Sequence, residues 1–89
     1  MEHFANQPYI VALDDDPTVP LLLGRATGIM AKGFECPTDL TVFKSTASPL
    51  AAFIDIHFGT EESGLDIIPS LRARWPYCPI IVVTSDSAE

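Results

Sequence analysis

The sequence predicts a small α/β domain, a parallel sheet of four strands with helices on both faces. Short apolar runs that suit buried strands alternate with stretches of helical spacing. The 89 residues suffice for one domain, expected over residues 9–89 after a polar lead-in at residues 1–8, and a hydrophobic fraction of 47% excludes a disordered chain. With no apolar run near the roughly 20 residues of a membrane span and no visible signal peptide, we expect a cytoplasmic protein.

The first strand and the first helix are expected before residue 34. Tyr9–Leu13 is an apolar run of strand length. Asp16 can cap the following helix, and Pro17 suits its first position, where a missing N–H costs nothing. Gly28 or Gly33 is expected to end it. The apolar residues at helical spacing, which should face the core, are Val19, Leu22, Leu23, Ala26 and Met30.

The middle of the chain predicts a second strand, a second helix and a third strand. Phe34–Cys36 is the short second strand, and the helix runs from Pro37 to about Ser48. The third strand is the apolar run Pro49–Phe58, which contains one carboxylate, Asp55. The residues expected on the inner side of the helix are Leu40, Phe43 and Ala47.

The last elements are a loop, a helix and a fourth strand. Gly59–Gly64 has the glycines and polar residues of a loop. Pro69 is tolerable only near the start of the helix that follows. The fourth strand is Ile80–Val83, which leads into Thr84. The apolar residues of the third helix are Leu65, Ile68, Leu71 and Trp75.

Polar residues follow three of the four strands. Parallel strands joined by right-handed crossovers end at one edge of the sheet, so Asp14, Asp15, Asp55 and Thr84 should meet there. Three carboxylates at close range raise each other's pKa unless a cation compensates. Oxygen ligands of high charge suit Mg²⁺ or another hard divalent ion. Asp55 could then attack a phosphorus atom and form an acyl phosphate, with Thr84 donating its hydroxyl.

Four segments, in order, resemble the receiver domain of bacterial two-component response regulators. They are Leu13–Pro17, Ile54–Asp55, Ser63–Asp66 and Val82–Ser85. The resemblance implies a flavodoxin-like (CheY-like) fold with strand order 2-1-3-4, truncated after the fourth strand, so that the family's last helix, strand and helix are missing.

The same resemblance implies a function and a set of site residues. A histidine kinase or phosphotransfer protein would donate a phosphoryl group to Asp55. Asp14 and Asp15, with Asp55 and the backbone carbonyl of His57, would bind Mg²⁺, and Thr84 would supply the switch hydroxyl. Such a receiver is a phosphoacceptor rather than an enzyme, with at most weak self-catalysed phosphotransfer and dephosphorylation.

Two departures from the family pattern bear on this function. Phe58-Gly59 stands where the family has a Met-Pro pair, and Gly64 lies one position further from Asp55 than usual. The family's lysine at the end of the fifth strand has no counterpart, and neither Lys32 nor Lys44 is placed to replace it. We therefore expect slow phosphotransfer and an altered phosphoryl lifetime.

The composition and the strand order also predict partners. A net charge of −7 argues against direct binding of nucleic acid. The fourth strand would be an apolar edge, so a homo-oligomer through Ile80–Thr84 is expected. Cys36 and Cys78, without clustered histidines, predict two buried, reduced thiols rather than a zinc site.

Two other functions fit parts of the sequence. Leu13–Val19 also resembles the first motif of haloacid dehalogenase-like phosphatases, in which Asp14 would be the nucleophile and Asp16 the general acid. Asp55 has no role in that reading. The third possibility is an interaction module that is not phosphorylated and pairs through its open edge. Asp16 can equally be only a helix cap, and His57 only a loop histidine.

Overall fold

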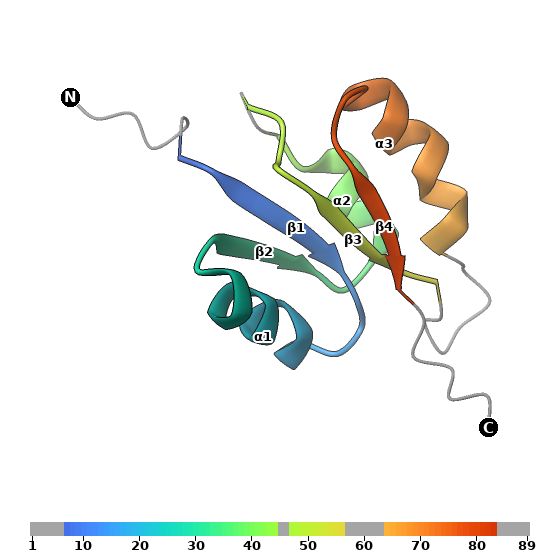
Figure 1. Ribbon diagram of the computed structural model, residues 1–89. Coiled ribbons are helices and arrows are strands. Elements are labelled where there is room, and N and C mark those ends of the chain that lie inside the picture. The colour runs from blue at the N-terminus through green and yellow to red at the C-terminus, as the bar shows by residue number, and fades with distance from the viewer. Residues whose placement is uncertain (1–6, 45–46, 57–63, 84–89) are drawn as a thin grey trace.

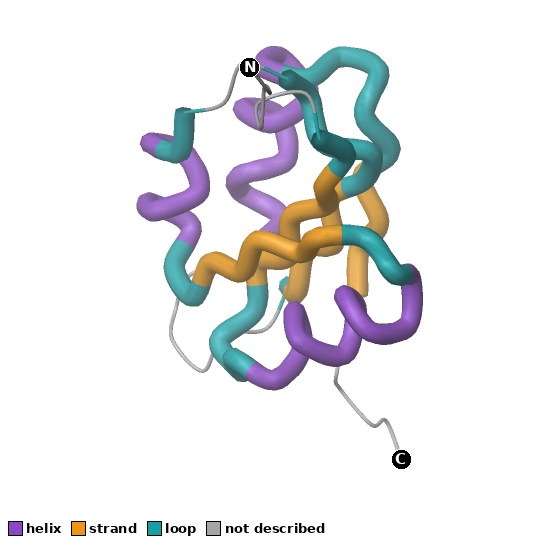
Figure 2. Tube along the Cα trace, turned by 90° about the vertical axis from the view of Figure 1, so that its left-hand side faces the viewer, coloured by secondary structure: helices purple, strands orange, loops and turns teal. Residues whose placement is uncertain are grey.

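The computed structural model describes residues 7–44, 47–56 and 64–83. Its four parallel strands lie in the order β2-β1-β3-β4, as predicted (Figure 1). Helix α1 lies on one face of the sheet, and helices α2 and α3 lie on the other (Figures 1 and 2). The elements are β1 Tyr9–Leu13, α1 Thr18–Thr27, β2 Met30–Phe34, α2 Pro37–Val42, β3 Ala52–Asp55, the 3-10 turn η2 Gly64–Ile67, α3 Ile68–Arg74 and β4 Ile80–Val83.

Strand β1 is buried along its whole length because it lies between two strands and under helices on both faces. The larger core lies between the sheet and the pair α2 and α3. Its fully buried side chains include Val11, Leu13, Leu40, Ile54 and Leu71. Leucine, isoleucine and valine at these positions remove apolar surface from water, which is the main force holding the layers together.

The expected inner face of α1 was only partly right, because Val19 and Leu23 are partly buried against the sheet whereas Leu22 and Ala26 are exposed. No residue of α1 is fully buried, Leu22 is 61% exposed, and Met30 belongs to β2 rather than to the helix. The helix instead approaches the sheet through Pro20 and Gly24, and a Cβ added to Gly33 of β2 would lie 2.5 Å from Pro20 Cγ. With this close approach over β2, Leu21 and Leu22 point outward, while Leu23 stays partly buried.

Several boundaries differ from the prediction. Strand β2 begins and ends earlier than the expected Phe34–Cys36, because Met30–Phe34 pairs in register with β1. Helix α2 ends at Val42 instead of Ser48, where Phe43 turns to an extended conformation. Strand β3 pairs only over Ala52–Asp55 of the longer apolar run.

Other expectations about the elements are confirmed. Gly28 ends α1 with a left-handed φ of 71°, which glycine adopts without strain. Pro69 lies in the first turn of α3. Both cysteines are free and Cys78 is buried, as predicted, whereas Cys36 is only partly buried. The loop Gly59–Ser63 lies outside the described residues.

Two arginines of α3 hold the ends of the helices in place. Arg74 Nη1 donates to the carbonyls of Leu40 and Thr41 at 3.1 and 3.3 Å, and its Cζ lies 4.8 Å from the Trp75 ring centroid. Arg72 Nη1 donates to the carbonyl of Cys78 at 2.8 Å. Arg74 thus adds a second donor at the Leu40 carbonyl, which also accepts the Phe43 N–H at 3.2 Å, and both arginines supply donors to carbonyls at the ends of the helices. Among the described helices, none has the length and apolar character needed to cross a membrane.

Candidate functional site

An acidic cluster, defined by Asp14, Asp15 and Asp55, lies at the carboxyl edge of the sheet. Leu13 and Ile54 are paired in adjacent strands, so the residues that follow β1 come close to the end of β3. One carboxylate oxygen from each of the three residues lies within 4.8 Å of the other two. Asp55 is only 3% exposed, Asp14 is partly exposed and Asp15 is exposed. The predicted convergence of these side chains is therefore present.

Backbone hydrogen bonds fix both strand ends that carry the cluster. The Asp14 N–H donates to the Phe34 carbonyl at 2.9 Å, which extends the pairing of β1 with β2. The Ile56 N–H donates to the Val83 carbonyl at 3.2 Å, just beyond Asp55. The carboxylates are thus presented by strand ends rather than by free loops, and rigid elements give a site its precision.

The pKa of Asp14 is raised above its usual 3.8. Burial is the main cause, since it removes water from the charged form, and the negative charges of Asp55, Asp15 and Asp16 add to it. The Asp16 N–H donates to Asp14 Oδ1 at 2.9 Å and opposes the shift. The cluster therefore carries an electrostatic strain that a cation would relieve.

Asp16 belongs to the start of α1 and not to the cluster. Its Oδ1 accepts hydrogen bonds from the Thr18 N–H at 3.0 Å and from Thr18 Oγ1 at 2.7 Å, and these bonds lower its pKa. The helix begins at Thr18, one residue later than predicted, and Pro17 before it makes no side-chain capping bond, so the Asp16 carboxylate is the group that caps the helix start, as predicted. A lowered pKa is the opposite of what a general acid needs.

The geometry of the cluster fits a hard divalent cation. All donors are carboxylate oxygens, the ligands that Mg²⁺ and Ca²⁺ prefer. Opposite ligands of one ion lie about 4.2 Å apart around Mg²⁺ and about 4.8 Å apart around Ca²⁺, from metal–oxygen distances of ~2.1 and ~2.4 Å. The three oxygens, within 4.8 Å of one another, already span this range. His57 and Thr84, which complete the predicted site, lie outside the described residues.

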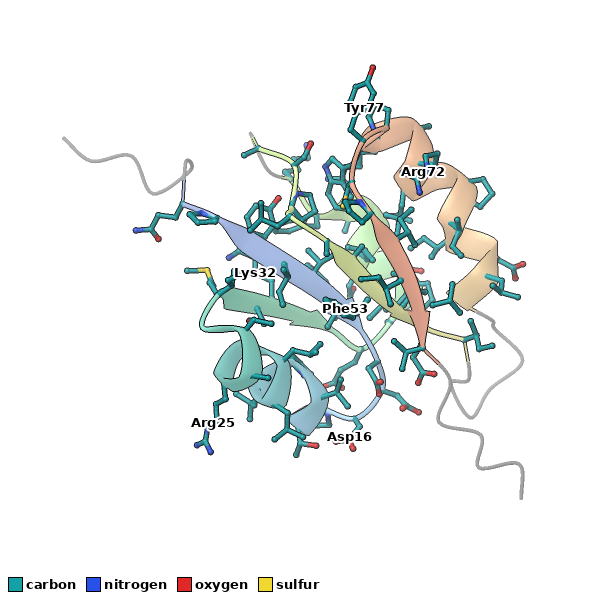
Figure 3. All side chains as sticks on the ribbon, viewed as in Figure 1. Asp16, Arg25, Lys32, Phe53, Arg72 and Tyr77 are labelled. Carbon is teal, nitrogen blue, oxygen red and sulfur yellow. The ribbon has the colours of Figure 1, made fainter. Side chains whose placement is uncertain are left out.

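None of the five Lys and Arg side chains, all in the described part of the chain, belongs to this edge. Lys32 lies in the middle of β2, opposite Val11, and Lys44 follows the end of α2. Figure 3 shows Arg25 at the far end of α1 from Asp16, and Arg72 on the opposite side of the molecule. The prediction that Lys32 and Lys44 supply no charge to the site agrees with these positions.

A small hollow beside the cluster was not predicted. It lies between α1 and the sheet and is lined by the apolar side chains of Val19, Leu23, Phe53 and Val83 next to Asp14 and Asp55. An apolar wall strengthens electrostatic interactions at the neighbouring carboxylates, because it keeps water from one side. The register of the sheet, which pairs Asp55 with Val83, and the packing of α1 over the sheet together bring the lining residues into contact.

Comparison with solved structures places the fold. No protein-family model matches the sequence, and no characterised protein matches it by sequence. The response regulator TrrA from Thermotoga maritima, in complex with Mg²⁺-BeF, has a TM-score of 0.72 at 22% identity, and the match covers 90% of this chain and 71% of TrrA. A response regulator from Burkholderia pseudomallei, with a phosphorylated aspartic acid and a calcium ion, has a TM-score of 0.76 at 20% identity, over 90% of this chain and 48% of that protein.

A third similar structure is the response regulator StyR, with a TM-score of 0.69 at 22% identity. The match covers 93% of this chain but only 43% of StyR, so the chain spans less than half of that protein. The strand order, the parallel pairing and the helices on both faces agree with these structures. The chain therefore has the flavodoxin-like fold of response-regulator receiver domains.

Proposed function

We propose that this domain accepts a phosphoryl group on Asp55 in two-component signal transduction. The observation that carries the proposal is the buried Asp55 carboxylate at the end of β3, with ligand oxygens of Asp14 and Asp15 within 4.8 Å. The similar structures support it, because TrrA was solved with Mg²⁺-BeF and the Burkholderia protein carries a phosphorylated aspartic acid. The expected donor is a histidine kinase or a phosphotransfer protein, and the expected location is the cytoplasm.

In the reaction, an Asp55 carboxylate oxygen attacks the phosphorus of the donor. The phosphorus–nitrogen bond of a phosphohistidine breaks, the electron pair stays on the imidazole, and an acyl phosphate forms on Asp55. Asp14 and Asp15 would hold Mg²⁺ together with Asp55 and the His57 carbonyl. That ion, when bound, neutralises charge on the phosphoryl oxygens. The Thr84 hydroxyl would donate to a phosphoryl oxygen.

The positions of the basic residues bear on the rate. With Lys32 in the middle of β2 and Lys44 after α2, no lysine of the described residues can stabilise the developing charge at the acidic edge. Preorganised charge is usually the largest contribution to phosphoryl transfer. We therefore expect slow labelling by small phosphodonors and slow loss of the phosphoryl group.

The test is labelling with acetyl phosphate, read by intact-protein mass spectrometry with and without Mg²⁺. The wild-type protein should gain the mass of one phosphoryl group only with Mg²⁺, and Asp55→Asn should gain none. Asp39→Asn, an exposed carboxylate in the first turn of α2, is the matched control and should label normally. Labelling that persists in Asp55→Asn, or that is absent from correctly folded wild-type protein, would contradict the proposal.

A specific observation favours a second candidate, an interaction module that pairs through β4 without being phosphorylated. Ile81, Val82 and Val83 are 41%, 46% and 37% exposed in β4, an edge strand of the sheet that the described residues form. A folded wild-type protein that fails to label while it self-associates would support this candidate. The phosphatase alternative, by contrast, needs Asp16 as a general acid, and the bonds from Thr18 hold Asp16 in its charged form.

A further inference from the structure

Asp16 forms hydrogen bonds in two directions, to the start of α1 and to the acidic cluster. Its Oδ1 accepts the Thr18 N–H at 3.0 Å and Thr18 Oγ1 at 2.7 Å, and its backbone carbonyl accepts the Val19 N–H at 3.1 Å. Its own N–H donates to Asp14 Oδ1 at 2.9 Å. Figure 3 shows Asp16 in the connection from β1 to α1. One exposed residue therefore joins the first turn of the helix to a carboxylate of the cluster.

The Asp14 side chain needs a partner because its neighbours repel it. Its backbone is fixed by the hydrogen bond from its N–H to the Phe34 carbonyl, but its side chain is partly exposed and has other staggered rotamers open to it. One of its carboxylate oxygens lies within 4.8 Å of oxygens of Asp15 and Asp55, and like charges at this distance favour rotamers that point away. The bond from the Asp16 N–H opposes that rotation and keeps the carboxylate in the cluster.

The helix that holds Asp16 is itself fixed against the sheet. Helix α1 packs so closely on β2 that a Cβ added to Gly33 would lie 2.5 Å from Pro20 Cγ. Gly33 directly precedes Phe34, the residue whose carbonyl holds the backbone of Asp14. Adjacent residues of β2 thus set the positions of both the donor and the acceptor of the bond between Asp16 and Asp14. A hydrogen bond between two elements of fixed position can orient a side chain precisely.

We propose that Asp16 is a positioning residue for the metal site. Its bonds to Thr18 hold its N–H toward Asp14, and this N–H orients the Asp14 carboxylate for a divalent cation. This role rests on the proposed function, in which Asp14 is a ligand of Mg²⁺, and Asp16 acts through Asp14 rather than as a ligand of its own. Loss of a partner that orients a metal ligand typically lowers metal affinity by about 10- to 100-fold.

The experiment is a titration of the 89-residue protein with Mg²⁺, followed by the amide chemical shifts in NMR spectra, which also show whether each variant is folded. Asp16→Asn and Asp16→Ala remove the same negative charge, but only asparagine keeps a side-chain oxygen that can accept from Thr18. Mg²⁺ should therefore bind Asp16→Ala about tenfold more weakly than Asp16→Asn. Because both variants have lost one charge, this ratio excludes the attraction between the Asp16 charge and the cation.

Two threonines of α1 provide a second comparison and a matched control. Thr18→Val removes the Oγ1 donor at 2.7 Å and leaves every charge in place, whereas Thr18→Ser keeps a hydroxyl. Thr18→Val should bind Mg²⁺ about threefold more weakly than Thr18→Ser, as expected for one hydrogen bond. Thr27→Val removes a hydroxyl that donates to the Leu23 carbonyl at 2.7 Å, at the other end of the same helix. This control should bind Mg²⁺ like the wild-type protein.

Three results would overturn the proposal. The first is equal Mg²⁺ affinity of Asp16→Ala and Asp16→Asn, since Asp16 would then only cap the helix. The second is a loss of affinity in Thr27→Val as large as in Thr18→Val, which would trace the effect to the stability of α1. The third is a wild-type protein that binds no Mg²⁺ at millimolar concentration. Labelling of Asp55 is a separate measurement, so the positioning role stands if the affinities follow the expected order while Asp55 does not label, and the proposed function stands in the reverse case.

Discussion

Replacing Asp14 with asparagine is expected to stabilise the metal-free protein and to remove most of its response to Mg²⁺. The asparagine oxygen can still accept the hydrogen bond from the Asp16 N–H, so the change removes a charge and little else. The free energy of unfolding should rise because the variant loses the repulsion between position 14 and the carboxylates of Asp15 and Asp55.

The size of this effect follows from the geometry. Two unit charges 4.8 Å apart repel by about 1 kcal/mol in water-like surroundings. Asp14 faces two such charges, and screening by salt and partial exposure reduce the sum to about 1 kcal/mol. In a domain of this size that corresponds to a rise in Tm of roughly 4–8 °C.

Mg²⁺ should also stabilise the wild-type protein, by compensating the charge that the substitution removes. A cation in tenfold excess over its Kd stabilises the folded state by about 1.4 kcal/mol, or roughly 6–11 °C in Tm. Thermal unfolding followed by circular dichroism at low salt, with and without Mg²⁺, gives both values. A metal-free Asp14→Asn protein that melts at or below the wild-type Tm, or a variant that responds to Mg²⁺ like the wild-type protein, would refute the reasoning.

The pH dependence provides a further check, with opposite signs for Asp14 and Asp16. The raised pKa of Asp14 means that the folded state binds its proton more tightly than the unfolded state. Its contribution is therefore present below pH 3.8 and is lost as the pH rises through the folded pKa. The lowered pKa of Asp16 gives stability above pH 3.8 that is lost on acidification. Asp14→Asn should therefore be more stable than the wild-type protein, and Asp16→Asn less stable, only at pH values above those at which the two carboxyl groups titrate.

Predictions for four substitutions concern the framework around the site. Gly33→Ala should lower the free energy of unfolding by about 1–3 kcal/mol, because the new Cβ would meet Pro20 at 2.5 Å. Gly24→Ala, whose Cβ would have ordinary contacts beyond 3.5 Å, should instead stabilise α1 by about 0.5–1 kcal/mol, and urea unfolding separates the two variants. Arg74→Met should cost about 1 kcal/mol in the same assay, since the Thr41 carbonyl loses its bond from Arg74 and the Leu40 carbonyl keeps only the Phe43 N–H. Burial raises the pKa of the Cys78 thiol, so the contribution of this thiol to stability should be constant below pH 9.0 and be lost above it, and stability should fall less steeply above pH 9.0 in Cys78→Ala. A wild-type stability that rises above pH 9.0 would contradict this last sign.

The sequence alone was enough for the architecture and for the members of the acidic cluster. Alternating strand and helix patterns lead to parallel strands, and parallel strands bring their carboxyl ends to one edge. The resemblance to receiver domains added the strand order, which the structure confirms. Asp14, Asp15 and Asp55 could be selected because a carboxylate directly after a buried apolar run has no role in packing.

What only the tertiary structure decided is how surfaces face each other. The leucines of α1 have helical spacing, but the contact between Pro20 and Gly33 turns Leu22 outward. Strand β2 was misplaced because Lys32 and Gly33 hide a strand that exists only through its pairing with β1. The hollow beside Asp55 depends on the register of β3 with β4. The spacing of apolar residues in a sequence indicates that one face of a helix or strand is apolar. Which other element packs against that face depends on the shapes of segments far apart along the chain.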